Sequence, residues 1–187
     1  AWQLAGQTQL RCSVNLSSRQ LQQGDFAARV ADVLRETGLA PASLVLEITE
    51  SQLMQDSAQN LACLRELASF GVQLALDDFG TGYSSLGYLK RFPLHIIKVD
   101  KSFIAGTPQD AEALAISRAI IGLGDSLGLT VVAEGVEQVQ QLEFLAREGC
   151  RYAQGYWFSP PRAPQELQRL LSGEDRFDGL CCPLDSQ

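Results

Sequence analysis

The stretch LVLEITESQLMQDSAQNLACLRELASFGVQLALDDFG, residues 44–80, contains a complete strand–helix–strand unit. Its first run, LVLEIT at residues 44–49, and its last run, VQLALD at residues 72–77, are mostly apolar and have the length of strands. Between them, residues 56–70 repeat apolar side chains at intervals of three and four, which is typical of a helix, and Gly71 ends the pattern. Near-continuous apolar strands joined by a helix predict a parallel sheet that is covered on both faces.

The same alternation continues on either side of this unit and predicts the α/β class. No glycine-rich phosphate-binding fingerprint follows the first predicted strand, as an open dinucleotide-binding sheet would require, so a (β/α) barrel is favoured. Strands are expected at residues 11–16, 44–49, 72–77, 95–99 and 130–133 and around Tyr152, and helices at residues 25–37, 56–70, 111–127 and 139–148.

Length, composition and charge indicate one globular domain. The 187 residues are 45% hydrophobic and 20% charged, and the formal net charge of -7 argues against binding to a nucleic acid polymer. The five cysteines are scattered and lack metal-binding spacing, which suggests reduced thiols. No apolar run approaches the roughly 20 residues of a membrane span, and no signal peptide is evident, so a cytoplasmic location is expected, although a longer parent protein could carry a membrane anchor.

Polar residues stand at the C-terminal ends of the successive predicted strands. In a barrel these ends open on one mouth, where several carboxylates remain ionised together only if cations neutralise them. Carboxylate and amide oxygens favour magnesium, manganese or calcium over zinc. Two such metals about 3.5 to 4 Å apart would polarise a phosphodiester and activate water. The residues at these ends are Asn15, Glu47, Asp77, Asp78, Lys98, Glu134 and Gln154.

Each of these positions also has a purely structural interpretation. Asn15 can start a turn or cap a helix, and Glu47 and Lys98 can form a core ion pair. The Asp77–Asp78 pair can simply begin a loop, because aspartate bonds its own backbone there. The structural interpretations would have to hold independently at every strand end, so the sequence favours a common metal site, with Lys98 orienting the water or stabilising phosphoryl charge.

Ordered segments of the chain resemble the successive motifs of the EAL phosphodiesterases, which cleave cyclic di-GMP. The resemblance implies a TIM-type (β/α)8 barrel with Mg2+ or Mn2+ at a two-metal site and inhibition by Ca2+. The segments are SVNLS (13–17), LEITE (46–50), DDFGTGYSSL (77–86), IKVDKSF (97–103), VAEGVE (132–137) and AQGYWFSPP (153–161).

The same resemblance implies roles for individual residues. Lys98 would hold the catalytic water, Glu134 would be a further acid at the metal centre, and Gln154 would support the water or the metal. The implied metal ligands are Asn15, Glu47, Asp77 and Asp78. The implied substrate contacts are Asp100, Tyr156, Ser159 and Pro160.

In the family, the loop that begins with DDFG couples the metal site to a dimer interface. The resemblance therefore implies that Glu50 anchors this loop, that Gly80 and Gly82 give it backbone freedom, and that a homodimer forms around residues 84–89. It also allows an upstream sensory or diguanylate cyclase domain.

The Glu-Ala-Leu motif that names the family lies on its first strand, and no predicted strand of this chain carries it. We therefore expect an incomplete barrel without the first strand and helix, a domain at residues 3–172, and a loosely ordered tail at residues 173–187. Open sheet edges would favour instability or pairing with another copy.

Three functions fit these observations. The first is hydrolysis of cyclic di-GMP to linear pGpG, and the second is a sensor that binds cyclic di-GMP without cleaving it. The third, reached without the family, is an enolase-like enzyme in which Lys98 is a base and the carboxylates hold a metal. The DDFGTGYSS loop counts against the third.

Overall fold

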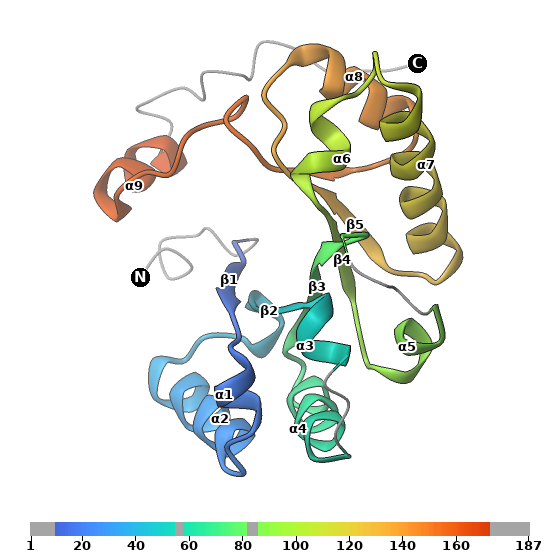
Figure 1. Cartoon of the computed structure of the whole chain (residues 1–187). Coiled ribbons are helices and arrows are strands. Elements are labelled where there is room, and N and C mark those ends of the chain that lie inside the picture. The colour runs from blue at the N-terminus through green and yellow to red at the C-terminus, as the bar shows by residue number, and fades with distance from the viewer. Residues whose placement is uncertain (1–9, 55–57, 82–85, 173–187) are drawn as a thin grey trace.

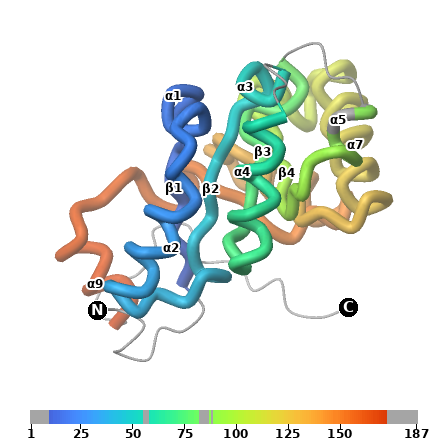
Figure 2. The backbone as a smooth tube through the Cα atoms, turned by 90° about the horizontal axis from the view of Figure 1, so that it is seen from below, coloured from blue at the N-terminus to red at the C-terminus, as the bar shows by residue number. Residues whose placement is uncertain are grey.

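The computed structural model describes residues 10–54, 58–81 and 86–172. Its sheet has six parallel strands whose spatial order is the order of the chain. The strands stand side by side in a curled sheet with helices outside it (Figures 1 and 2). The strands are β1 (Cys12–Asn15), β2 (Leu44–Thr49), β3 (Gln73–Phe79), β4 (Ile96–Val99), β5 (Thr130–Ala133) and β6 (Tyr152–Ala153).

This arrangement confirms the predicted α/β class and the incomplete barrel, because in-order parallel strands with intervening helices are the wall of a (β/α) barrel. Among the described residues, β1 and β6 are the two edges of the sheet. Gly82, residues 3–9, the predicted tail at 173–187 and the start of the predicted dimer segment at 84–89 lie outside the described residues.

The predicted long helices are present with ends shifted by one or two residues. They correspond to α2, α4, α7 and α8. The remaining helices were not predicted, since most are too short to show a 3.6-residue period. The helices are α1 (Ser18–Leu21), α2 (Phe26–Thr37), α3 (Glu50–Met54), α4 (Ala58–Ser69), α5 (Leu86–Arg91), α6 (Lys101–Ala105), α7 (Ala111–Ser126), α8 (Val139–Arg147) and α9 (Pro164–Ser172), with a 3-10 turn at Pro41–Ser43. Within the described part of the chain, no helix combines the length and apolar character needed to cross a bilayer.

The two faces of the sheet bury different clusters. Because side chains alternate along a strand, every second residue faces the helices and forms the main core, as Leu74 and Ile97 do with 0% exposure. The intervening residues face the inside of the curled sheet, where a second, smaller cluster fills the floor of the partial barrel. That inner cluster consists of Val45, Ala75, Ile96 and the partly buried Val132.

Three strands differ from the predicted bounds by one residue at an end, namely β1 at both ends and β3 and β4 at their starts, and the far end of β3 differs by two. The expected end of β3 at residue 77 was wrong, since the strand continues to Phe79. The pairing of β3 with β4 shifts register between Leu76 and Phe79, and Asp78 has a φ of 54°. A left-handed residue inside a strand produces a bulge and changes the direction of its side chain. The alternation alone would have sent Asp77 and Asp78 to opposite faces.

Candidate metal and active site

Strand register places the predicted site residues one layer above the inner cluster. Glu47 pairs with Asn15 on one side and with Ala75 on the other, so the three side chains share the inner face. Asp77 lies two residues beyond Ala75, and Lys98 lies two residues beyond Ile96, which keeps both on that face. The site is therefore a polar layer at the C-terminal mouth, set on an apolar floor.

Lys98 is the centre of this layer. Its ammonium Nζ lies 2.9 Å from Glu47 Oε2, 3.0 Å from Asp77 Oδ1 and 2.7 Å from Glu134 Oε1. The side chain of Lys98 is only 8% exposed. Burial alone would lower the pKa of Lys98, but the contacts with Glu134, Glu47 and Asp77 outweigh it and raise the pKa above its usual value. Lys98 is thus a buried, permanent cation shared by carboxylates from three other strands or strand exits.

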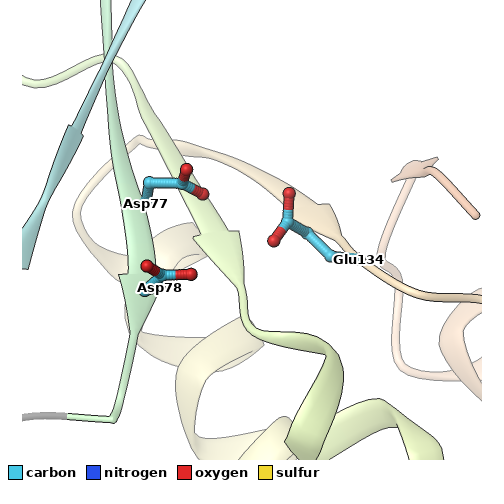
Figure 3. Close-up of side chains that lie close together, drawn as sticks. All are labelled: Asp77, Asp78 and Glu134. Carbon is cyan, nitrogen blue, oxygen red and sulfur yellow. The ribbon is translucent and has the colours of Figure 1, made fainter. Parts of the chain in front are cut away.

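Carboxylates outnumber this cation. Oxygens of Asp77, Asp78 and Glu134 all lie within 4.8 Å of one another, and Figure 3 shows the three groups facing a common space. Burial raises the pKa of Asp78, and the nearby charges of Asp77 and Asp100 raise it further. Burial also raises the pKa of Glu134, against the lowering effect of Lys98. The cluster has more negative charge than Lys98 neutralises.

A hard divalent cation fits this donor set. Asp77 Oδ1 is buried, and the contact that compensates its charge is the ion pair with Lys98 Nζ, which Glu47 and Glu134 share. Buried charges need compensation, and close carboxylates with oxygen-only donors are the coordination that Mg2+ and Mn2+ prefer. The bulge at Asp78 is what brings neighbouring carboxylates to one centre.

Two further predicted residues border this layer. The side-chain amide of Gln154 donates to Glu134 Oε1 at 2.7 Å, so it holds the same oxygen that Lys98 contacts. Asn15 is exposed at the end of β1, beside Glu47 in register. The predicted strand-end residues therefore gather at the mouth. Those on β1 to β4 lie within the strands, and the other two lie in the segments that follow β5 and β6.

Glu50, the predicted anchor of the DDFG loop, contacts the start of that loop. Glu50, at the start of α3, accepts a long hydrogen bond of 3.4 Å from the amide of Gly80. Gly80 has a φ of 100°, and a Cβ at this position would lie 2.8 Å from the ring of Phe103. Glycine is the residue that allows both a positive φ and such a short distance to the Phe103 ring, so Gly80 lets the loop pack directly against α6.

The predicted substrate residues lie around the mouth rather than in the carboxylate layer. Asp100 caps α6, since its Oδ1 accepts from the amide of Ser102 at 2.9 Å. Tyr156 is 67% exposed, and Pro160 is exposed as well. Ser159 Oγ accepts from Arg162 Nε at 2.7 Å. Tyr156 and Pro160 are accessible to a ligand, whereas Asp100 and Ser159 already have protein partners.

The sequence analysis missed two contributors to the site. Lys101 lowers the pKa of Asp78 by its charge, and a Cβ added at Gly135 would lie 2.5 Å from the Cβ of Lys101. The apolar floor below Lys98 was missed as well. The alternation in VQLALDD and HIIKVD, which places Ala75 below Asp77 and Ile96 below Lys98, was the signal that pointed to it.

A curled parallel sheet with buried carboxylates and a lysine at its C-terminal mouth defines a (β/α)-barrel protein with an acidic site at the mouth. The EAL domain model matches residues 1–161, and the chain belongs to this family.

Similar proteins agree with that assignment. Cyclic di-GMP phosphodiesterase NbdA of Pseudomonas aeruginosa is 45% identical over 175 residues, which cover 94% of this chain and 22% of NbdA. The structure of PaMucR phosphodiesterase in complex with c-di-GMP superposes with a TM-score of 0.84 at 42% identity, covering 89% of this chain and 67% of that one. A manganese and c-di-GMP complex of BlrP1 from Klebsiella pneumoniae has a TM-score of 0.75 at 34% identity, covering 81% and 39%. The chain spans about a quarter or less of the length of relatives such as NbdA.

Proposed function

We propose that this chain provides most of the active site of a phosphodiesterase that hydrolyses cyclic di-GMP to linear pGpG with Mg2+ or Mn2+. The observation that carries the proposal is the set of carboxylates around buried Lys98 at the mouth of an EAL-family barrel. NbdA is named for this activity, and the PaMucR and BlrP1 structures contain the same dinucleotide.

The acidic layer suits the metal role. Asn15, Glu47, Asp77 and Asp78 are the proposed ligands, with Glu134 beside them, and the close oxygens of Asp77, Asp78 and Glu134 support this set. Divalent cations bound there would neutralise phosphate charge and lower the pKa of a bound water. The BlrP1 structures with manganese and with calcium support a divalent ion of this kind, and inhibition by Ca2+ is part of the proposal.

The protein's own groups would then act on water and substrate. Lys98 keeps its proton, and its three N–H groups face Glu47, Asp77 and Glu134. Once one of these carboxylates turns to a bound cation, the ammonium would have an N–H for the attacking water or for a phosphoryl oxygen. Glu134, whose pKa is raised, accepts a proton from that water while Gln154 fixes its carboxylate. The water oxygen forms a bond to phosphorus as the bond from phosphorus to the ribose 3′ oxygen breaks. That oxygen takes a proton from solvent water, and Glu134 afterwards releases to solvent the proton that it accepted. Tyr156 and Pro160 would border the guanine, with Asp100 and Ser159 behind them.

The decisive experiment measures turnover in the natural full-length protein. Purified protein is incubated with cyclic di-GMP and Mn2+, and the products are separated by chromatography. Linear pGpG is expected from the wild type and from Arg118→Ala, which removes an exposed ion pair at the other end of the barrel. Lys98→Ala should still bind the dinucleotide but lose cleavage. Binding without cleavage by the wild type would instead indicate a sensor.

Assembly and location complete the proposal. A homodimer around residues 84–89 is supported by the Glu50–Gly80 contact, which holds the near end of the preceding loop. Light scattering of the natural protein tests the dimer. An upstream diguanylate cyclase domain is supported by MucR of Pseudomonas aeruginosa, which is named as a bifunctional enzyme and of which this chain covers 24%. A cytoplasmic site of action follows from a cyclic dinucleotide substrate and is tested by cell fractionation.

A further inference from the structure

Gln141 is a buried polar residue that lies outside the catalytic layer. It is 2% exposed in the first turn of α8. Its Oε1 accepts from the amides of Glu137 at 2.8 Å and Gln138 at 3.0 Å. Its Nε2 donates toward the carbonyls of Ile104 at 3.3 Å and Ala105 at 3.5 Å. Both ends of this side chain are therefore occupied by backbone groups from two different segments.

Those two segments are the exits of neighbouring strands. α6 directly follows β4, the strand that contains Lys98. The carbonyls of Ile104 and Ala105, at the end of α6, therefore belong to the segment that leaves β4. Residues 134–138 lead from β5 to α8 and begin at Glu134. Figure 1 shows α6 and α8 next to each other above the ends of these strands. Gln141 joins the two exits above the layer in which Lys98 contacts Glu134.

A second set of contacts runs from the same loop to Gln154. Val136, which is 0% exposed, donates its amide to the carbonyl of Gln154 at 3.0 Å, and its carbonyl accepts from Trp157 at 2.9 Å. Gly155 lies so close that a Cβ there would be 2.2 Å from the carbonyl oxygen of Val136. The position of Val136 therefore sets the position of the Gln154 backbone, and the Gln154 side chain holds Glu134.

We infer that Gln141 is a positioning residue for the metal site. It holds residues 136–138 against α6, so that Val136 fixes Gln154 and Gln154 fixes the Glu134 carboxylate. The consequence for catalysis rests on the proposed phosphodiesterase function. The consequence for metal binding depends only on Glu134 and its neighbours binding a divalent cation, and it can be measured without turnover.

A purely local role makes a different prediction. If Gln141 only caps α8, its loss would lower the melting temperature and leave the Mn2+ affinity unchanged. Groups that orient metal ligands instead change metal affinity by about 10- to 100-fold when they are lost. Residues that act through one another also give non-additive double mutants.

The experiment is a double-mutant cycle on Mn2+ affinity in the natural full-length protein. Isothermal titration with Mn2+ is carried out on the wild type, Gln141→Met, Gln154→Ala and the double variant, and melting temperatures are recorded. Gln141→Glu is the second variant, because it keeps the acceptor for the amides of residues 137 and 138 and turns a carboxyl oxygen, in place of the amide donor, toward the carbonyls of α6. Thr107→Val is the matched control, since Thr107 is 1% exposed and donates to the same Ile104 carbonyl at 2.8 Å without touching the loop.

The expected result is that Gln141→Met, Gln141→Glu and Gln154→Ala each weaken Mn2+ binding about tenfold. The double variant should be no weaker than the worse single variant. Thr107→Val should lower the melting temperature and bind Mn2+ like the wild type. Additive effects, or wild-type affinity in Gln141→Met, would overturn the inference, and so would a wild type that does not bind Mn2+. If Mn2+ binding follows the expected pattern but no pGpG forms, the proposed function fails while the positioning role stands.

Discussion

Gln154 donates its side-chain amide to Glu134 Oε1 at 2.7 Å, across the gap between the exits of β5 and β6. The same oxygen lies 2.7 Å from Lys98 Nζ, so it has two donors and a fixed position. Removing Gln154 would leave the carboxylate held by Lys98 alone.

We therefore expect Gln154→Ala to lower kcat for cyclic di-GMP by about tenfold, the equivalent of one hydrogen bond to a charged group. KM should change less, because the amide contacts Glu134 rather than the exposed ligand-facing residues. Steady-state kinetics check this prediction. A kcat within twofold of the wild type would contradict it.

Lys98 also stabilises the metal-free fold, because it is the buried cation between Glu47, Asp77 and Glu134. Lys98→Met keeps the volume and removes the charge, which leaves the buried carboxylates without their shared partner. Loss of one partner from a buried ion pair costs about 3 to 5 kcal/mol. We expect that loss in urea denaturation without metal, and a partial recovery when saturating Mn2+ is added.

The matched control is Arg147→Ala, whose ion pair with Glu143 lies at the surface, with side chains that are 73% and 56% exposed. Exposed pairs contribute about 0 to 1 kcal/mol, so this variant should be nearly neutral with and without metal. If both variants lost the same free energy of unfolding, the buried Lys98 ion pairs would contribute no more to stability than an exposed pair.

The left-handed backbone of Asp78 separates its structural role from its ligand role. At a φ of 54°, glycine and asparagine are tolerated and a β-branched residue is strained. Asp78→Gly and Asp78→Asn should keep the melting temperature and lose Mn2+ affinity. Asp78→Val should lose both, with an added strain of about 1 to 2 kcal/mol. Titration with Mn2+ and thermal melts, run together, check this, and a folded Asp78→Asn with wild-type affinity would rule out the ligand role.

Gly155 tests the packing of the segment that carries Gln154. A Cβ on Gly155 would lie 2.2 Å from the Val136 carbonyl oxygen and 2.3 Å from its nitrogen. Gly155→Ala should cost about 3 kcal/mol, since backbone atoms cannot move aside easily. Gly122→Ala, in α7, meets nothing within 4 Å and should add about 0.5 to 1 kcal/mol. Denaturant unfolding of both variants measures the contrast, and a neutral Gly155→Ala would contradict this close approach of the two backbone segments.

His95 gives a pH dependence that is separate from the metal site. Its Nδ1 accepts from the amide of Leu74 at 3.2 Å, and burial lowers the pKa of His95 below 6.5. Since the folded state binds this proton less readily than the unfolded state, stability rises with pH from the lowered native pKa up to about 6.5. It is lost as the pH falls through that window.

His95→Asn removes the titration and keeps an acceptor near the position of Nδ1. We expect the melting temperature of the wild type to fall more steeply between pH 7 and pH 5 than that of this variant. Parallel pH profiles for the two proteins would show that His95 does not contribute.

The strand–helix alternation and the polar residues at the strand ends can be read from the amino-acid sequence alone. Apolar strands such as LVLEI and HIIKV are local patterns, so they predicted a parallel sheet and the mouth at which Glu47, Lys98 and Glu134 meet. The order of the motifs predicted the family, which the match over residues 1–161 confirms. Both kinds of information are present in short segments of the chain.

Which of these residues contact one another, and how their pKa values are shifted, depends on the tertiary structure. Asp78 adopts its left-handed backbone where β3 pairs with β4. Lys98 and Gln154 share one Glu134 oxygen, and Gln141 links the end of α6 to the loop before α8, because separate segments pack together there. The pKa values also depend on burial, which is a property of the packed barrel. Local patterns identify candidate residues, whereas long-range contacts fix their geometry and charge, because they form only when distant strands pair and the helices cover them.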